Sequence, residues 1–386
     1  MKIAVIGVRE IPADRGEIER YCQEFYPRIA ARGHQVDLFV QPEPNRHPWF
    51  SVGYYHNVRI IALASLPRKH ISFFLNSALS TIWASLGNYD VIHIQGTKAA
   101  WFAWFPQLFS GSKIVVTTHK LDLTRSKLQK TFRWLLPWIE RTAVKNADEI
   151  VVTSKPLGEY FQCKYNIRPR YIPNAPGIDR PTDSFNYGKT LGLKTKRYIL
   201  CLGSLSPENR PDLAIQAFQK LQNPDWKLVI AGEIGDSLKY AIELLSLAKQ
   251  NRDIIFTNEI REENLAEIIT NAGLLVVPGN GSDLRLPVPV LKAMQQRVPV
   301  LASDNPINQE LIGRDRGLLF ESGKVDSLLQ KLQYALSEPT VLTNIAQLAQ
   351  NYVAINHNWD RVTYGNLSLY LKMTASIYSQ SISHNL

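Results

Sequence analysis

The 386-residue sequence is short of cysteine and of long apolar runs, and each shortage excludes a class of protein. Its three cysteines stand far apart without a Cys-x-x-Cys pair, which argues against a disulfide framework or a structural zinc site and fits a reducing compartment. No His, Asp and Glu residues recur with metal-ligand spacing, so we expect neither a metal nor a cofactor. The most apolar long stretch, 71–86, contains several polar residues and is too short to span a bilayer. The first apolar run reaches Arg9 too soon for a signal peptide, so we expect a cytoplasmic location.

Positive charge is concentrated in the first half of the chain. Lysine and arginine outnumber aspartate and glutamate by 24 to 14 over residues 1–180, whereas the remainder holds 20 of each kind. A basic half favours an anionic partner such as a membrane surface, a lipid-linked phosphate or nucleic acid, and the alternative is solubility charge without a partner. Because no nucleic-acid-binding motif accompanies the charge, we expect no nucleic-acid partner.

Strand and helix patterns alternate along both halves. Short β-branched runs are followed by residues at helical spacing, for example 2–7 by 18–32 and 198–203 by 211–221. Further strands are expected at 35–40, 91–94, 114–118, 150–153, 227–232, 254–256, 274–278 and 300–302. This order predicts an α/β fold of two doubly wound Rossmann-like domains facing a central cleft, with ligands at the carboxyl ends of the strands. The boundaries that we expect are an N-terminal domain at 1–175, a linker rich in Pro, Gly and Asp at 176–196, a C-terminal domain at 197–355 and a closing helix at 356–386.

Two motifs in the second half are the most informative. Val-Pro-Val-Leu-Lys-Ala-Met at 288–294 is followed by Val-Pro-Val-Leu-Ala-Ser-Asp at 298–304, and Leu-Gly-Ser-Leu-Ser-Pro-Glu-Asn-Arg-Pro-Asp occupies 202–212. With segments 1–9, 118–122, 147–154 and 172–174, they resemble family 4 glycosyltransferases of the GT-B fold, especially the bacterial polysaccharide and rhamnosyltransferase-like branch. The resemblance implies metal-independent transfer of a sugar from a nucleotide sugar, held by the C-terminal domain, to a glycan or lipid-linked acceptor on the N-terminal domain.

The residues that contact the donor in the family are replaced here. The family's arginine and lysine that reach the diphosphate correspond to Ser204 and Asn209, although the adjoining Gly203 is retained. Its two glutamates, one for the donor sugar and one for the ribose, correspond to Leu284 and Lys292. Each lost charge-assisted contact to phosphate removes about 1.5–3 kcal/mol. The resemblance therefore implies a degenerate donor site.

Neighbouring residues offer displaced substitutes for these contacts. Asp283 lies one position out of register with the first glutamate, and Arg210 and Arg285 carry charges that reach a phosphate only if the loops shift. Arg285 and Pro287 also replace the two glycines of the family's Gly-Phe-Gly turn.

The amino-terminal loop departs in the same way. Where the family has a glycine near residue 10 and a Gly-Gly pair, this chain has Glu10, Gly16 and Glu17. A carboxylate at Glu17 adds bulk and repels a diphosphate that would otherwise lie against helix-terminal N–H groups.

Three polar residues match family positions. His119 matches a histidine near the donor sugar and is the candidate catalytic residue, with a structural histidine as the alternative. Glu310 matches an acidic position, and its alternative is a carboxylate at a helix start, where the helix dipole favours it. For Asp122 a turn residue is the simpler interpretation.

Tryptophan and basic residues are interleaved at 101–141. Such a mixture suits a peripheral membrane surface, and the alternative is that the rings pack in the core while the charges are solvated. The residues concerned are Trp101, Trp104, Trp134, Trp138, Arg125, Lys127, Lys130, Arg133 and Arg141.

Two functions from different classes fit the sequence. One is a glycosyltransferase whose catalysis is weak or lost. The other is a non-catalytic homologue that binds a glycan or regulates a partner glycosyltransferase, and the replaced donor contacts favour it slightly.

Overall fold

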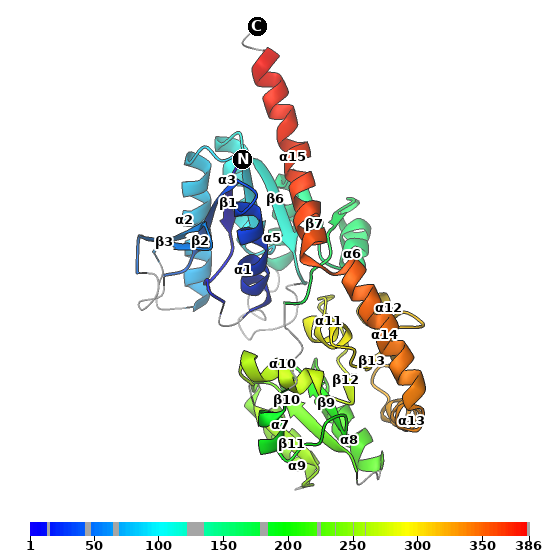
Figure 1. Cartoon of the computed structure of the whole chain (residues 1–386). Coiled ribbons are helices and arrows are strands. Elements are labelled where there is room, and N and C mark those ends of the chain that lie inside the picture. Colours follow the sequence, from blue (N-terminus) through cyan, green and yellow to red (C-terminus); the bar gives the residue numbers. More distant parts are fainter. Residues whose placement is uncertain are drawn as a thin grey trace. The chain divides into compact units, whose positions relative to one another are not determined.

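The computed structural model describes two compact units. Unit 1 comprises Met1–Asn174 and Trp359–Leu386, and unit 2 comprises Ala175–Asn358 (Figure 1). Asp122 and the basic residues Arg125, Lys127, Lys130 and Arg133 lie outside the described residues. The described ranges are 1–13, 16–42, 48–64, 69–121, 135–177, 184–221, 225–235, 237–249, 251–258 and 260–383.

Unit 1 is built on an eight-stranded sheet of order β3-β4-β2-β1-β5-β6-β7-β8. All neighbouring strands are parallel except the edge strand β3, which pairs antiparallel with β4 through a hairpin that the sequence patterns did not predict. The predicted strand at 35–40 agrees with β2, and the other predicted strands differ from the structure by one or two residues at their ends. The strands are β1 (Lys2–Ile6), β2 (Gln35–Val40), β3 (Ser51–Tyr55), β4 (Val58–Ala62), β5 (Val91–Gln95), β6 (Lys113–Thr118), β7 (Glu149–Val152) and β8 (Arg170–Tyr171).

Helices cover both faces of this sheet. The closing helix α15 packs beside α1, while α2, η1, α3 and α5 form a second contiguous group. A right-handed parallel βαβ arrangement of this kind brings the carboxyl ends of β1, β5, β6 and β7 to one edge. The helices are α1 (Glu17–Ala30), α2 (Lys69–Leu86), η1 (Ala99–Phe102), α3 (Trp104–Phe109), α5 (Leu136–Asn146), α6 (Lys155–Tyr165) and α15 (Trp359–Ser383).

Unit 2 is built on a six-stranded, fully parallel sheet of order β11-β10-β9-β12-β13-β14. The segment expected to link the domains contributes to this unit, since α7 lies within it and Phe185 and Leu193 are buried in the core. The strands are β9 (Tyr198–Leu202), β10 (Lys227–Ala231), β11 (Ile254–Asn258), β12 (Leu274–Val277), β13 (Val300–Ser303) and β14 (Leu318–Phe320). The helices are α7 (Asn186–Thr190), α8 (Pro211–Leu221), α9 (Leu238–Ala248), α10 (Glu262–Thr270), α11 (Val288–Gln295), α12 (Pro306–Ile312), α13 (Val325–Ser337) and α14 (Pro339–Asn356).

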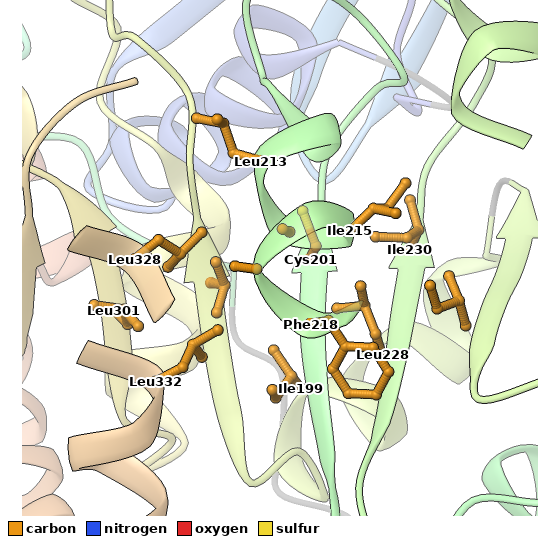
Figure 2. Close-up of a cluster of buried hydrophobic side chains, with 14 of the residues drawn as sticks. Ile199, Cys201, Leu213, Ile215, Phe218, Leu228, Ile230, Leu301, Leu328 and Leu332 are labelled. Atoms are coloured by element: carbon orange, nitrogen blue, oxygen red, sulfur yellow. The ribbon is translucent and has the colours of Figure 1, made fainter. Parts of the chain in front are cut away.

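The alternation of side chains along β9 fills two separate cores. Ile199 and Cys201 point to the face covered by α8 and α13, where Phe218 and Leu332 pack, as Figure 2 shows. The intervening residues, such as Leu200, belong to the core on the opposite face. Because both faces of the sheet are covered, polar loops meet only at its edges. The predicted α/β fold with two Rossmann-like sheets is confirmed.

Candidate functional site

At the carboxyl edge of the unit 2 sheet, the backbones of two loops lie very close together. Gly203 follows β9 and Gly232 follows β10, and the Gly203 N–H donates to the Ala231 carbonyl at 2.9 Å. A Cβ on Gly232 would overlap the Gly203 carbonyl, so only glycine fits there. The sequence therefore brings the turn after β9 into the position where strand ends bind ligands in doubly wound folds.

Ser204 and Asn209, which replace the expected arginine and lysine, hydrogen-bond to each other. The Asn209 amide donates to the Ser204 carbonyl at 2.8 Å and to its hydroxyl at 3.0 Å. The same amide lies over Gly203, where a Cβ would be only 3.2 Å from Asn209 Nδ2. The turn is thus closed on itself by two short polar side chains.

Arg210, one of the displaced cations, is held by an ion pair inside unit 2. Its guanidinium donates to both carboxylate oxygens of Asp212 at 3.0–3.2 Å, and Tyr240 also donates to that carboxylate at 2.5 Å. The hydrogen bonds to Asp212 raise the pKa of Arg210. A phosphate would have to displace Asp212 to recruit this arginine.

The loop before α11 holds a second internal pair. Arg285 lies 3.1 Å from the buried carboxylate of Asp283. Leu284 between them has φ 50°, a left-handed conformation that is uncommon for a leucine, and its N–H donates to the Gly281 carbonyl. Asp283, which lies one position from the glutamate register, is therefore already paired with Arg285.

Lys292 and Glu310 lie on α11 and α12 respectively. Lys292 is buried, and it offers hydrogen-bond donors where the family presents an acceptor to ribose. Glu310 is the fifth residue of α12. The first turn of this helix contains no acidic residue and is capped by the Asn305 side chain. The alternative interpretation of Glu310 as a helix-start carboxylate is therefore wrong.

A small cavity lies at this edge of unit 2. Its volume is about 40 Å³, and it is lined by Gly203, Ser204 and Asn209 together with the ends of β9, β10 and β12. Gly279, at the end of β12, lines it from the other side, and the neighbouring Asn280 N–H donates to the Glu208 carbonyl at 3.0 Å. At this volume the cavity has room for a few water molecules.

The predicted His119 lies at the carboxyl edge of the unit 1 sheet, directly after β6. It is buried, its Nε2 is 2.9 Å from Gln95 Oε1, and its ring meets the Tyr21 ring edge-on at 4.9 Å. Its Nδ1 is also buried and has no hydrogen-bond partner among the described residues. Burial lowers the pKa of His119 to about 3, with a further contribution from the nearby Lys120 charge. His119 is therefore neutral at physiological pH.

Gln95 belongs to a buried polar cluster that the sequence patterns did not reveal. Its amide donates to the Tyr26 hydroxyl at 2.7 Å, and that hydroxyl lies 2.9 Å from His93 Nδ1. Tyr370 of the closing helix reaches the same His93 nitrogen at 2.5 Å. For this part of the cluster the sequence predicts only a short buried strand at 91–94.

The amino terminus of α1 is occupied by a carboxylate from within the helix. Gly16 stands before Glu17 with φ 99°, and a Cβ there would overlap the side chain of Glu19. Glu19 is buried and also accepts from the Arg9 N–H at 3.4 Å. Its burial raises the pKa of that carboxyl. Glu19 is the third residue of α1, where a capping box places its glutamate, but Gly16 has no side chain to complete such a box.

Large apolar side chains are exposed on the helix group α2, α3 and α5 of unit 1. Trp83, Trp104 and Trp138 are 53%, 43% and 64% exposed, whereas Trp101 is partly buried against Phe74. Beyond the predicted tryptophans, the same helices expose Ile82, Leu86, Leu108 and Phe109. We call these exposed residues of α2, α3 and α5 the aromatic surface. Trp134 lies outside the described residues. Within the described part of the chain, no helix is both long enough and apolar enough to cross a bilayer.

The aromatic surface is apolar on two helices and basic on the third. From residue 71 onward α2 has no charged residue, and α3 has none. On α5, Trp138 shares one exposed face with Arg141 and Lys145 at helical spacing, whereas Glu140 is buried against Lys164. The three helices are neighbours, because α3 packs against both α2 and α5.

Comparison with known proteins matches both halves of the chain. Residues 18–180 match the family model described as Glycosyltransferase Family 4, and residues 184–352 match that of Glycosyl transferases group 1. Among curated proteins, the UDP-Gal:alpha-D-GlcNAc-diphosphoundecaprenol alpha-1,3-galactosyltransferase of Escherichia coli is 23% identical over 70% of this chain and 72% of that enzyme.

Solved structures match the fold over nearly the whole chain. Sucrose-phosphate synthase from Thermosynechococcus elongatus superposes with a TM-score of 0.80 at 20% identity, covering 97% of this chain and 99% of that one. Anabaena HepE in complex with UDP-glucose gives a TM-score of 0.74 at 16% identity, covering 98% and 100%. At these identities the structures establish the fold alone.

Proposed function

Because this chain belongs to glycosyltransferase family 4 and has the GT-B fold, we propose that it acts in the assembly of a polysaccharide or glycolipid with a donor site that binds nucleotide sugars weakly. The hydrogen bond between Ser204 and Asn209 carries this proposal. Two cations that would stabilise a diphosphate are replaced by neutral groups that satisfy each other. Arg210 and Arg285, the remaining candidates, are engaged by Asp212 and Asp283.

The energetic consequence is a large loss of affinity for the leaving group. Removing two charge-assisted contacts at about 1.5–3 kcal/mol each weakens diphosphate stabilisation by a hundredfold or more. Leu284 and Lys292 add the loss of two acceptors for hydroxyl groups. Weak residual transfer and a non-catalytic role, in which the protein binds a glycan or regulates a partner glycosyltransferase, both follow from such a site.

The acceptor side favours a lipid-linked substrate. The relative from Escherichia coli is named for a diphosphoundecaprenol acceptor. A protein that works on such an acceptor gains from lying on the membrane, and the aromatic surface of unit 1 has the tryptophans and flanking basic residues for that. Docking of this surface on an anionic bilayer is therefore part of the proposed function.

A repair experiment tests the donor-site proposal. The variant combines Glu17→Gly, Ser204→Arg, Asn209→Lys, Leu284→Glu and Lys292→Glu, which restores the family's residues at five positions. It should bind UDP or another nucleoside diphosphate at least about tenfold more tightly than the unmodified chain, or about 1.4 kcal/mol. Each single change should gain little, because an added buried charge without its partners is destabilising.

Two controls make the repair decisive. Circular dichroism and thermal unfolding must first show that the combined variant is folded. Reversing only the Ser204 and Asn209 changes within it should then remove most of the gain. A folded combined variant that binds no better than the unmodified chain would contradict the proposal, since the loop with Arg285 and Pro287 would then block the site by itself.

A further inference from the structure

The edge strand β3 lacks the features that normally keep a sheet edge from pairing. Because β3 ends the strand order of the unit 1 sheet, one side of its backbone has no strand partner among the described residues (Figure 1). Natural edge strands are protected by charges, by proline or by short length. Residues 48–55 contain no charged residue, and the strand itself contains no proline. The opposite edge is protected, since β8 has only two residues and begins with the exposed Arg170.

Large apolar side chains are exposed along this edge. Val52 and Tyr54 are 60% and 75% exposed, and they share one face of the strand because side chains alternate. Trp49 and Phe50, in the turn directly before β3, are also more than half exposed. Exposed apolar patches of this kind mark interaction sites. The edge therefore offers both an unpaired backbone and an apolar surface to a partner.

The turn between β3 and β4 determines which backbone groups face outward. Its two residues, 56–57, both have positive φ, as in the two-residue hairpin turns of type I′. Tyr55 and Val58 flank this turn and face each other in the register, so they form the hydrogen-bonded pair that closes it. The direction of the N–H and C=O groups alternates along a strand. Those of Val52 and Tyr54 therefore point to the open edge.

We propose that β3 pairs edge to edge with β3 of a second copy of this chain, which joins the two unit 1 sheets across a two-fold axis at Gly53. In this antiparallel register Val52 faces the partner's Tyr54, and each outward-facing N–H meets an outward-facing C=O. Each tyrosine ring then lies beside a smaller valine, a favourable cross-strand pair. Glycine faces glycine at the pair where two antiparallel strands approach most closely.

The occupant is a second copy because this edge is complementary to itself. The small residue lies at the centre, the apolar residues lie symmetrically around it, and no like charges are brought together. In the same register Trp49 and Phe50 lie beside the partner's turn and extend the apolar contact. A two-fold pair uses the free edge of both copies, so the assembly closes as a dimer and does not grow. The interface is small, and we expect a dissociation constant in the micromolar range.

Sedimentation velocity of the full chain from about 1 to 200 µM, without lipid or nucleotide, measures this association. The unmodified chain should pass from monomer to dimer. Val52→Pro removes only an outward-facing N–H, which an edge strand tolerates, and should weaken the dimer at least about tenfold. Ile242→Lys changes a residue of α9 that is exposed to a similar extent and should leave the dimer unchanged. Circular dichroism checks that both variants are folded.

Hydrogen exchange places the contact on the strand. The amides of Val52 and Tyr54 should exchange more slowly as the protein concentration rises. The amide of Gly53 points to β4 and should be protected at every concentration.

Charge pairs test the register without changing any backbone donor. Val52→Lys with Tyr54→Lys places lysine opposite lysine, and Val52→Glu with Tyr54→Glu places glutamate opposite glutamate. Each double variant should stay monomeric at about 200 µM, because like charges directly opposite are destabilising. A mixture of the two should form dimers with one copy of each kind at low salt, since every lysine then faces a glutamate.

Three results would overturn the inference. They are a chain that stays monomeric over the whole concentration range, a dimer that survives Val52→Pro and both double variants, and a mixture of the double variants that stays monomeric. A dimer lost on Ile242→Lys would place the contact on α9 and contradict the inference as well. Because these experiments use neither nucleotide nor lipid, their failure leaves the proposed function intact.

Discussion

The candidate ligand-contacting side chains at the carboxyl edges of the two sheets differ in how they are engaged by their neighbours. In unit 2, Ser204 bonds to Asn209, and Arg210 pairs with Asp212. In unit 1, His119 Nε2 lies 2.9 Å from Gln95 Oε1, whereas its Nδ1 is buried without a hydrogen-bond partner among the described residues. A polar group that is buried without a partner is costly, so it persists where a ligand supplies the partner. The contrast teaches that the candidate phosphate contacts of unit 2 are engaged by neighbouring side chains, whereas the candidate residue of unit 1 has one nitrogen without a partner among the described residues.

Acid should destabilise unit 1 more than any other change considered. Burial lowers the pKa of both His93 and His119 to about 3, whereas a histidine in the unfolded chain titrates near 6.5. The unfolded state therefore binds more protons between about pH 6.5 and pH 3, and stability falls as the pH falls through that window. Each histidine contributes about 1.4 kcal/mol per pH unit.

Urea unfolding monitored by hydrogen exchange of β5 amides measures this slope. His93→Gln should be less stable at pH 7 yet lose less further stability at pH 5. The exposed His56→Gln is the matched control and should keep the steep slope. Equal slopes in all three proteins would mean that the buried histidines do not control acid sensitivity.

Vesicle binding tests whether the aromatic surface differs from the rest of the exterior. Replacing Trp83, Trp104 and Trp138 together by serine should weaken binding to phosphatidylglycerol vesicles by roughly a hundredfold, at about 1 kcal/mol for each partly inserted ring. Binding of the unmodified chain should also fall steeply with salt, because its basic residues contribute through screened charge. Vesicle co-sedimentation measures both effects.

An exposed apolar residue of unit 2 provides the control for docking. Leu238 of α9 is 63% exposed, and Leu238→Ser should leave vesicle binding unchanged. A further variant with Lys127, Lys130 and Arg133 replaced by glutamate, all outside the described residues, should lose the salt-sensitive part. If the tryptophan variant sediments like the unmodified chain at every salt concentration, the aromatic surface does not dock on membranes.

The smallest expected effect belongs to Asn209. Asn209→Ala removes two hydrogen bonds from a partly buried turn and should lower the free energy of unfolding by about 1 kcal/mol. Its affinity for nucleotides should not change, because the amide binds the protein's own turn. A gain in nucleotide affinity from Asn209→Ala alone would show that the Asn209 side chain blocks a site that can otherwise bind a nucleotide.

The sequence patterns predicted elements more readily than contacts. The helix at 211–221 and the strand at 35–40 agree with the structure because apolar periodicity is strong there. The β3–β4 hairpin was missed, since Val52 and Tyr54 are exposed on an edge strand that gives no buried run. α7 was missed because the five-residue helix lies in a segment rich in proline, glycine and aspartate.

The sequence identified candidate site residues but not the hydrogen bonds between them. The motif resemblance identified Ser204 and Asn209 as replaced positions, but their mutual bond depends on the shape of a turn that periodicity does not encode. The contact between Gln95 and His119 joins residues 24 apart in sequence, so it follows only from the register of the neighbouring strands β5 and β6. Whether a polar residue is satisfied is a property of three-dimensional packing.

Calorimetry of the unmodified protein tests the central claim most directly. The protein is titrated with UDP, GDP, ADP and dTDP and with their glucose conjugates under identical salt and pH. We predict no saturable binding below the millimolar range, because Ser204 and Asn209 satisfy each other and the two nearby arginines are engaged. Micromolar binding of any of these nucleotides would contradict the account, and Arg210 and Arg285 would then be its phosphate ligands.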